Sequence, residues 1–150
     1  MDGGFFIRQV KLGDLRKICE IEEKSFPYPW SILSFLYVYH ESPKFFFVAV
    51  KDGKVVGYII LKVRENVWKS GHLLNLAVDP KYRRRGIGRA LLKYALEILK
   101  KESVKNVWLE VRASNNPAIN LYLSLGFVKI RKVSKYYPDG EDAIIMMKRL

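Results

Sequence analysis

A basic, glycine-containing turn between an apolar run and a helical pattern constrains the fold more than any other part of this chain. The turn reads Tyr-Arg-Arg-Arg-Gly-Ile-Gly-Arg over residues 82–89. The run before it, residues 72–78, predicts a buried strand that ends at an Asp-Pro pair. After it, apolar residues recur at helical spacing: Ile87, Ala90, Leu91, Tyr94, Ala95, Ile98 and Leu99. The chain is therefore expected to pass here from a strand through a tight turn into a helix.

Such a turn can bind an anion. The first amides of a helix have no acceptor within it, and the helix dipole favours negative charge there. Gly86 and Gly88 let a ligand approach the main chain without a Cβ atom in the way. The flanking cations, which attract phosphate, are Arg83, Arg84, Arg85 and Arg89. A phosphate site is one interpretation of the turn, and a solvated cationic loop is the other.

Two other phosphate-binding motifs do not fit this turn. The turn lacks the Gly-Lys-Ser/Thr ending of a P-loop. Leu91 stands where the dinucleotide-binding fingerprint needs its third glycine. The sequence therefore favours neither of those nucleotide sites.

The composition indicates one folded domain over residues 1–150. Apolar residues make up 49% of the chain, which is enough for a substantial core. No apolar run reaches the roughly 20 residues of a transmembrane helix, and the first residues do not resemble a signal peptide. The single cysteine, Cys19, points to a reducing compartment, so we expect a cytoplasmic protein. The two histidines, His40 and His72, lack clustered carboxylates and predict no metal site.

The strongly basic charge leaves a second class of function open. The chain has 27 Lys and Arg against 15 Asp and Glu, a net charge of +12. This balance favours polyanionic partners such as phosphorylated cofactors, ribosomes or nucleic acid. A basic ribosome- or nucleic-acid-binding module is therefore an alternative, although we find no recognition helix, zinc ligands or exposed aromatic strand motif.

The remaining patterns predict strands and helices in the order β-α-α-β-β-β-α-β-α-β-β. The expected strands are residues 5–10, 45–50, 55–63, 72–78, 106–112, 127–137 and 143–149, with 64–71 as a polar connection. The expected helices are residues 12–24, one from the cap Ser31 to about residue 40, 87–101, and one from 114–117 to Gly126. Asp52-Gly53 predicts a tight hairpin turn. Two prolines make an aromatic elbow of residues 26–30, either a packed corner or the lip of a groove.

Two motifs together resemble the GNAT acetyltransferase superfamily. Arg83-x-x-Gly86-x-Gly88 resembles the acetyl-CoA pyrophosphate loop of that family. Residues 115–127 resemble its Asn-x-x-Ala-x-x-x-Tyr segment followed by Leu-Gly-Phe, and the order of elements matches as well. The resemblance implies an α/β (α+β) fold with a mixed, mostly antiparallel seven-stranded sheet and about four flanking helices. It also implies that the central strands, residues 72–78 and 106–112, splay apart to admit acetyl-CoA.

Three further segments resemble the N-terminal protein acetyltransferases within that superfamily, including the ribosomal-protein alanine acetyltransferases and their archaeal relatives. They are Glu-Val-Arg-x-Ser-Asn at 110–115, Tyr-Tyr-x-Asp-Gly-Glu-Asp-Ala at 136–143, and Phe-x-x-Pro-Trp at 26–30. The implied function is direct acetylation of a protein N-terminus in a ternary complex, with a possible ribosome association and a monomer or weak homodimer. A lysine or small-molecule amine acetyltransferase on the same fold is the alternative.

The resemblance also implies roles for two catalytic residues. Glu110 matches the proton acceptor, acting through water, and Tyr122 matches the general acid that protonates the sulfur of CoA. From its position alone, Glu110 shares a strand face with Trp108 and Arg112, where a plain Glu–Arg pair is the alternative. Tyr122 lies among leucines, where a core tyrosine is the alternative.

The implied binding residues fall into two groups. Those for the cofactor are Leu76, Ala77 and Val78 through their backbone, Arg83, Arg84, Arg85, Gly86, Ile87, Gly88 and Arg89 for the pyrophosphate, and Asn115 for the pantetheine arm. Those for the substrate are Phe26, Pro27, Tyr28, Asn75, Tyr136 and Tyr137. Asn115 also suits a helix N-cap, and the two roles are compatible. Asn120 departs from the Arg or Lys that relatives often carry, which puts one cofactor contact in doubt.

Overall fold

The computed structural model describes residues 4–150 and groups the chain into two compact units. Unit 1 comprises Met1–Lys62, as far as it is described, and Leu74–Glu97; unit 2 comprises Val63–Leu73 and Ile98–Leu150. The single domain expected over residues 1–150 stays a prediction. The expectation that no signal peptide is present falls partly on residues 1–3, which lie outside the described residues.

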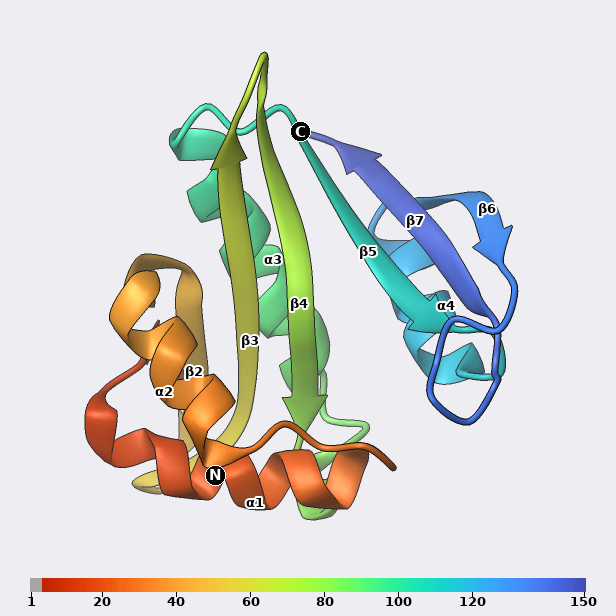
Figure 1. The fold of residues 1–150 in the computed structure, drawn as a ribbon. Coiled ribbons are helices and arrows are strands. Elements are labelled where there is room, and N and C mark those ends of the chain that lie inside the picture. Colours follow the sequence, from red (N-terminus) through yellow and green to blue (C-terminus); the bar gives the residue numbers. More distant parts are fainter. Residues whose placement is uncertain (1–3) are drawn as a thin grey trace. The chain divides into compact units, whose positions relative to one another are not determined.

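The strands are hydrogen-bonded into a seven-stranded sheet in the order β1-β2-β3-β4-β5-β7-β6 (Figure 1). They are β1 (Phe6–Gln9), β2 (Phe46–Lys51), β3 (Lys54–Glu65), β4 (Lys69–Val78), β5 (Asn106–Arg112), β6 (Val128–Val133) and β7 (Ala143–Arg149). The α-helices are α1 (Leu15–Ser25), α2 (Ile32–Glu41), α3 (Ile87–Lys101) and α4 (Asn116–Ser124). The predicted order of elements and the mixed α/β class are therefore confirmed.

Most of the strand pairs in this sheet are antiparallel. β4 and β5 pair in parallel where Ser70–His72 lies beside Asn106–Trp108. The predicted splay of these strands farther along involves both units and stays a prediction. Within residues 4–150, no helix has the length and apolar character needed to cross a membrane.

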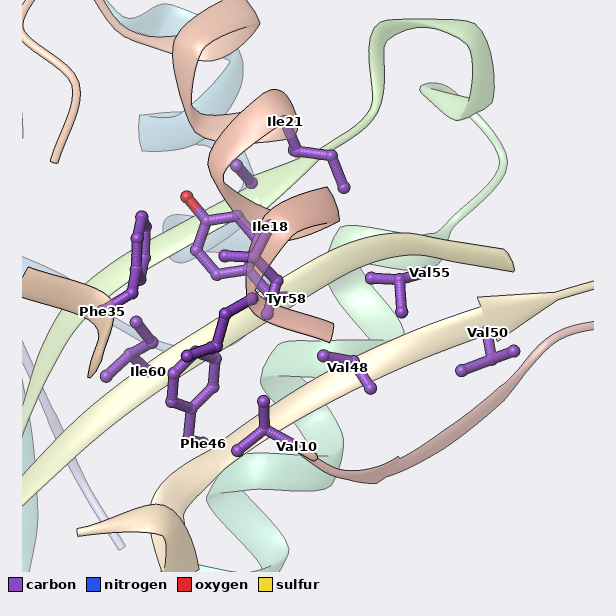
Figure 2. Packing of buried hydrophobic residues seen from close by; sticks show 12 residues of the cluster. Val10, Ile18, Ile21, Phe35, Phe46, Val48, Val50, Val55, Tyr58 and Ile60 are labelled. Atoms are coloured by element: carbon purple, nitrogen blue, oxygen red, sulfur yellow. The ribbon is translucent and has the colours of Figure 1, made fainter. Parts of the chain in front are cut away.

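In unit 1, helices cover both faces of the sheet. Phe46 and Val48 of β2 join a cluster with Ile18 and Phe35 on the face covered by α1 and α2 (Figure 2). Phe47, which points the opposite way, contacts the Tyr94 ring of α3 with the ring centroids 5.1 Å apart. Because neither face meets water, every residue of β2 is buried.

Two local signals that the sequence offers are confirmed by the backbone. Asp52 and Gly53 both have positive φ, at 51° and 75°, as a type I′ turn between β2 and β3 requires. Ser31 caps α2, because its Oγ accepts a hydrogen bond from the Ser34 N–H at 3.3 Å. Both features were predictable because the residues that form each of them are close in sequence: Asp52 with Gly53, and Ser31 with Ser34.

Three predicted boundaries are wrong. The polar connection expected at 64–71 is largely strand, since β3 continues to Glu65 and β4 starts at Lys69. Its polar side chains are tolerated because they lie at the exposed strand ends, where the Lys69 Nζ lies 3.2 Å from the Glu65 carboxylate. The first expected helix opens with a 3-10 turn, Leu12–Asp14. The strand expected at 127–137 stops at Val133, which leaves a longer loop before β7.

In unit 2, β5 has one apolar face and one polar face, as the sequence predicts. Val107, Leu109 and Val111 are buried, and Trp108, Glu110 and Arg112 on the other face are half-buried. β5 pairs with β7 along its whole length. The functional side chains of β5 are therefore held on a strand with a partner at every residue.

Candidate active site

The basic turn in unit 1 has the backbone that an anion site needs. Arg84 and Gly86 have positive φ, at 62° and 78°, and α3 begins directly afterwards at Ile87. The first amides of α3 have no acceptor within the helix and lie beside these residues. A Cβ atom built on Gly86 would meet no atom within 4 Å. The turn is therefore open to a ligand, and its amides and arginines fit a diphosphate.

Arg83 connects this turn to its surroundings. Its Nε donates to the Val78 carbonyl at 3.0 Å, and its Nη2 donates to the Ser25 hydroxyl at 3.1 Å. Arg83 thus fixes the end of β4, where the resemblance expects the cofactor's thioester. The Arg85 guanidinium lies 5.3 Å from the centre of the Tyr82 ring.

A buried carboxylate closes the strand that leads into the turn. Asp79 is 3% exposed, and its Oδ1 accepts a hydrogen bond from the Lys81 N–H at 3.0 Å. Burial alone would raise the pKa of Asp79, but the Lys81 N–H and the Lys17 ammonium together hold it below the ordinary value. Asp79 is therefore a charged cap that fixes the start of the turn.

The predicted substrate residue Asn75 is hydrogen-bonded inside unit 1. Its Nδ2 donates to the Glu22 carboxylate at 2.7 Å, and Glu22 is only 1% exposed. The same carboxylate accepts hydrogen bonds from the Tyr58 hydroxyl and from the Trp30 N–H. Glu22 was not predicted from the sequence, although an acidic residue on the apolar stripe of α1 was a usable signal.

The aromatic elbow has a packed side and an open side. Phe26 and Trp30 are partly buried against the unit 1 core, and the Trp30 ring lies 5.2 Å from that of Phe35. Pro27 and Tyr28 are exposed. The elbow therefore has features of both predicted alternatives, a packed corner and an exposed lip.

In unit 2, Glu110 pairs with His72. The Nε2 of His72 lies 2.8 Å from Oε2 of Glu110, with the two side chains 12% and 18% exposed. Because a carboxylate can only accept, Nε2 carries the hydrogen. Arg112, the residue that the alternative pairs with Glu110, is ion-paired with Asp139 and Glu141.

His72 is fixed in this position by stacking. Its ring lies 3.6 Å from the Trp108 ring, and the two planes differ by 7°. Its Nδ1 atom is buried and has no hydrogen-bond partner among the described residues. His72 was missed as a site residue, although a histidine beginning an apolar strand pattern is unusual enough to have indicated one.

The predicted substrate tyrosines lie close to the predicted base. Burial, together with the nearby Glu110 carboxylate, raises the pKa of Tyr136. The Tyr137 ring centre lies 4.2 Å from the Arg112 guanidinium carbon. The structure thus brings Glu110, Tyr136 and Tyr137 together within unit 2.

The predicted general acid is a buried phenol. Tyr122 on α4 is 7% exposed, and its ring centre lies 5.7 Å from that of Phe127. Burial, with a contribution from Tyr137, raises the pKa of Tyr122 well above its ordinary value. Tyr122 therefore keeps its proton at neutral pH, as a proton donor must.

Asn115 has the predicted N-cap geometry. Its Oδ1 accepts a hydrogen bond from the Ala118 N–H at 3.3 Å at the start of α4. This bond fixes the orientation of the side chain, and the contact with pantetheine stays a prediction. No group of three or more His, Cys, Asp or Glu side chains in residues 4–150 is placed to hold a metal ion.

Comparison with known proteins identifies the family. The family model described as "Acetyltransferase (GNAT) family" matches residues 15–127. An N-alpha-acetyltransferase of Sulfurisphaera tokodaii is 41% identical over 150 residues, which cover 93% of this chain and 90% of the relative. The ribosomal protein bS18-alanine N-acetyltransferase of Escherichia coli strain K12 is 41% identical over 144 residues, covering 93% and 94%.

A solved structure agrees with these sequence matches. The crystal structure of the ribosomal-protein-S18-alanine N-acetyltransferase from Escherichia coli superposes with a TM-score of 0.88 at 40% identity, covering 97% of this chain and 94% of that one. The two chains therefore share one fold over nearly their whole length. This chain belongs to the GNAT acetyltransferase family and is an N-acetyltransferase that uses acetyl-CoA.

Proposed function

We propose that this chain acetylates the α-amino group of protein N-termini by direct transfer in a ternary complex. The observation that carries the proposal is the Glu110 carboxylate, whose Oε2 lies 2.8 Å from His72 Nε2 on the polar face of β5. The names of the relatives support an N-terminal amine as the acceptor. Acetyl-CoA, when bound, supplies the acetyl group as a thioester.

Glu110 acts as the general base in this proposal. An α-amino group has a pKa of about 8, so much of it carries a proton at neutral pH and must lose that proton before it attacks. Glu110 accepts it through a water molecule, and the His72 N–H stabilises the carboxylate and fixes its orientation. Because no acyl-enzyme is required, Cys19 takes no part.

Tyr122 acts as the general acid. The thiolate of CoA needs a proton as it leaves, and a buried phenol with a raised pKa retains one to give. The ring contact with Phe127 fixes the direction of the hydroxyl. The two proton transfers thus belong to different residues of unit 2.

The cofactor is held by main-chain groups and arginines. We assign the diphosphate to Arg84, Arg85, Ile87, Gly88 and Arg89, at the open turn that Gly86 makes possible. Leu76, Ala77 and Val78 pair with the pantetheine amides, as one strand pairs with another, and Asn115 binds the same arm. Arg83 contributes by bonding the Val78 carbonyl, which fixes the end of β4, and the N–H of Val78 stabilises the oxyanion.

The peptide acceptor is bound by aromatic residues. Pro27 and Tyr28 on the open side of the elbow, with Phe26 beneath them, contact the first residues of the peptide. Tyr136 and Tyr137 contact it from the loop after β6. Asn75 contacts it through its side-chain oxygen, since its Nδ2 donates to Glu22. We place this reaction in the cytoplasm, where the basic surface also suits association with ribosomes.

The test is an acetylation assay on a panel of peptides. One set has free Ser, Ala, Met and Thr ends, and the other has blocked ends and an internal lysine. We expect acetylation of the free ends, with Glu110→Gln as the inactive control. Acetylation of only the blocked, lysine-containing peptides overturns the proposal and favours the lysine alternative.

A second measurement tests the binding-module alternative. Thermal stabilisation by CoA is compared with that by an oligonucleotide at two salt concentrations. We expect CoA to stabilise the protein at both. Stabilisation by the oligonucleotide alone, lost at the higher salt concentration, supports the binding module instead.

A further inference from the structure

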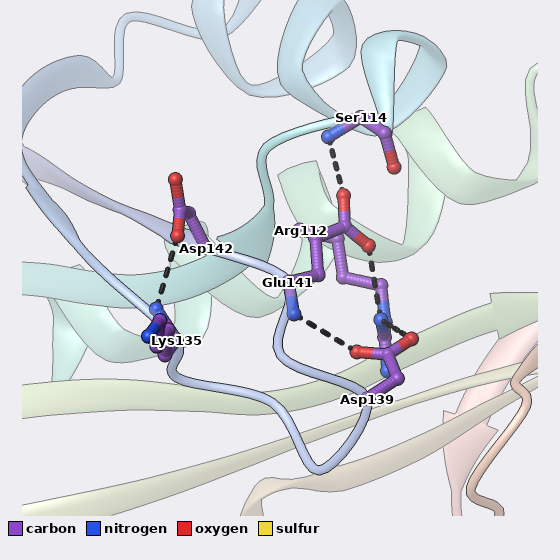
Figure 3. Close-up of polar contacts among 6 residues, drawn as sticks. All are labelled: Arg112, Ser114, Lys135, Asp139, Glu141 and Asp142. Carbon is purple, nitrogen blue, oxygen red and sulfur yellow. Dashed lines mark hydrogen bonds and ion pairs between the residues drawn. The ribbon is translucent and has the colours of Figure 1, made fainter.

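The loop of residues 134–142, between β6 and β7, has a defined shape of its own. The Tyr136 and Tyr137 N–H groups both donate to the Glu141 carbonyl, at 3.0 and 3.1 Å. The Gly140 N–H donates to the Tyr137 carbonyl at 2.8 Å, and the Asp142 carboxylate accepts from the Lys135 N–H at 3.0 Å (Figure 3). These bonds close the loop on itself but do not by themselves fix it to β5.

Arg112 on β5 makes that connection. Its Nη1 donates to Oδ2 of Asp139 at 2.8 Å and to Oε1 of Glu141 at 2.9 Å (Figure 3). The other oxygen of Glu141 accepts from the Ser114 N–H at 2.9 Å. One guanidinium therefore contacts two of the three acidic residues of the loop, and one of these two, Glu141, also reaches the segment that leads into α4.

The same guanidinium lies against Tyr137. The distance from its carbon to the ring centre is 4.2 Å, which is the geometry of a cation–π contact. The neighbouring Tyr136 reaches Glu110, two residues before Arg112 on the same face of β5. Arginine can pair with carboxylates and lie flat against an aromatic ring at the same time, because its guanidinium is planar and forked. The lysine ammonium is neither planar nor forked, so lysine cannot do both.

The carboxylates that hold Arg112 are charged throughout the neutral range. The Glu141 N–H and the Arg112 guanidinium hold the pKa of Asp139 below its ordinary value. Ser114 and Arg112 do the same for the pKa of Glu141. Because these side chains are partly exposed, their role is to set geometry more than to add stability.

We propose that Arg112 is a positioning residue that holds the 134–142 loop in the shape that binds the peptide acceptor. It acts through Asp139, Glu141 and the Tyr137 ring, and it touches neither the thioester nor the amine. The inference rests on the proposed function, in which Tyr136 and Tyr137 contact the peptide. Arg112 would thus favour a peptide as the acetyl acceptor by keeping Tyr136 and Tyr137 in place.

The test is the kinetics of Arg112→Lys, which keeps the charge but loses the planar fork. We expect the KM for a free-amino peptide to rise roughly tenfold, with KM for acetyl-CoA and kcat close to those of the unaltered chain. Arg131→Lys on β6 is the matched control, because Arg131 is exposed and outside the loop contacts. An unchanged peptide KM, or an equal change in both KM values, overturns the inference.

Hydrogen exchange gives a readout that does not depend on the reaction. The Tyr136 and Tyr137 amides should exchange faster in Arg112→Lys than in Arg131→Lys, while the β5 amides stay protected. If Arg112→Lys does not fold, Asp139→Ala with Glu141→Ala removes the carboxylate partners of Arg112 from the loop side and should raise the peptide KM alike. If the unaltered chain acetylates no free-amino peptide, the proposed function fails, and exchange still decides whether Arg112 holds the loop.

Discussion

His72 and Glu110 form a hydrogen-bonded pair, with His72 Nε2 lying 2.8 Å from Glu110 Oε2 across the parallel contact between β4 and β5. Stacking on Trp108 keeps the imidazole in place. This pair gives the proposed base a defined orientation.

Replacing either member of this pair should slow the reaction without weakening CoA binding. Glu110→Gln removes the proton acceptor, and we expect kcat to fall about 100-fold or more. His72→Phe retains stacking on Trp108 but removes the N–H that orients Glu110, so we expect a smaller loss of kcat. Steady-state kinetics and calorimetric titration with CoA measure these effects. Near-normal kcat in Glu110→Gln would falsify the assignment of the base.

Tyr122→Phe should separate proton donation from packing. The ring and its contact with Phe127 remain, but the proton donor is lost, so we expect kcat to fall by about 100-fold with little change in the melting temperature. Tyr94→Phe on α3 is the matched control, since that ring packs on Phe47. Equal activity of the two variants argues for Tyr122 as a core residue only.

The sequence predicts features that depend on near neighbours and misses those that depend on register. The Asp52-Gly53 turn and the Ser31 cap lie beside the residues that they organise, so pattern is sufficient. His72 and Glu110 are separated by 38 positions, and their contact requires the register of β4 against β5. Register is set by backbone pairing across the sheet, and one sequence does not display it.

The site shows the same division. Burial of alternate β5 residues was predictable from the period of the strand, and it places Glu110 correctly on the polar face. The partner of Glu110 was not predictable, because Arg112 was an equally reasonable neighbour by spacing alone. The ion pairs of Arg112 with Asp139 and Glu141 connect β5 to a loop 27 to 29 residues away, which the spacing along β5 does not indicate.

Gly86→Ala should weaken CoA binding through backbone strain and not through a clash. The φ of 78° costs an L-residue about 1 kcal/mol, while a Cβ there would meet no atom within 4 Å. Relief of that strain would turn the amides at the start of α3 away from the diphosphate. Denaturant unfolding and calorimetry with CoA measure the two effects. Gly13 also has open space around it but no positive φ, so Gly13→Ala should change neither the free energy of unfolding nor the CoA affinity. An unaltered CoA affinity in Gly86→Ala would contradict this prediction.

The free energy of unfolding should decrease as the pH rises above about 10, partly because of Tyr137. Burial, assisted by Tyr136, raises the pKa of Tyr137 to about 12 from the ordinary 10.0. Below about pH 10 both folded and unfolded chains keep this proton, so the stabilisation is complete. Between about pH 10 and pH 12 the unfolded chain loses it first, and stability declines. Ultraviolet titration of Tyr137→Phe should lack one late-ionising phenol, and an unchanged curve contradicts the assignment.

Glu22 should be among the most sensitive positions for stability. Its carboxylate is 1% exposed and accepts from Tyr58, Asn75 and Trp30, so it joins α1 to β3, to β4 and to the elbow. Glu22→Ala leaves those three donors buried without an acceptor and opens space in the core. We expect the free energy of unfolding to drop by about 2–4 kcal/mol, measured by denaturant titration.

The neighbouring carboxylate provides the control. Glu23→Ala removes an exposed acidic residue from the same helix, and its effect should stay within about 0.5 kcal/mol. Asn75 and the Trp30 N–H bond different oxygens of Glu22, so Glu22→Gln keeps an acceptor at one of the two positions and should recover part of the loss. The Glu22 carboxylate joins Trp30 of the elbow to Asn75 of β4. Because both the elbow and Asn75 are proposed to contact the peptide, Glu22→Gln should also raise the KM for peptide more than the KM for acetyl-CoA. Equal losses of stability in Glu22→Ala and Glu23→Ala would show that the buried hydrogen bonds contribute nothing beyond helix propensity.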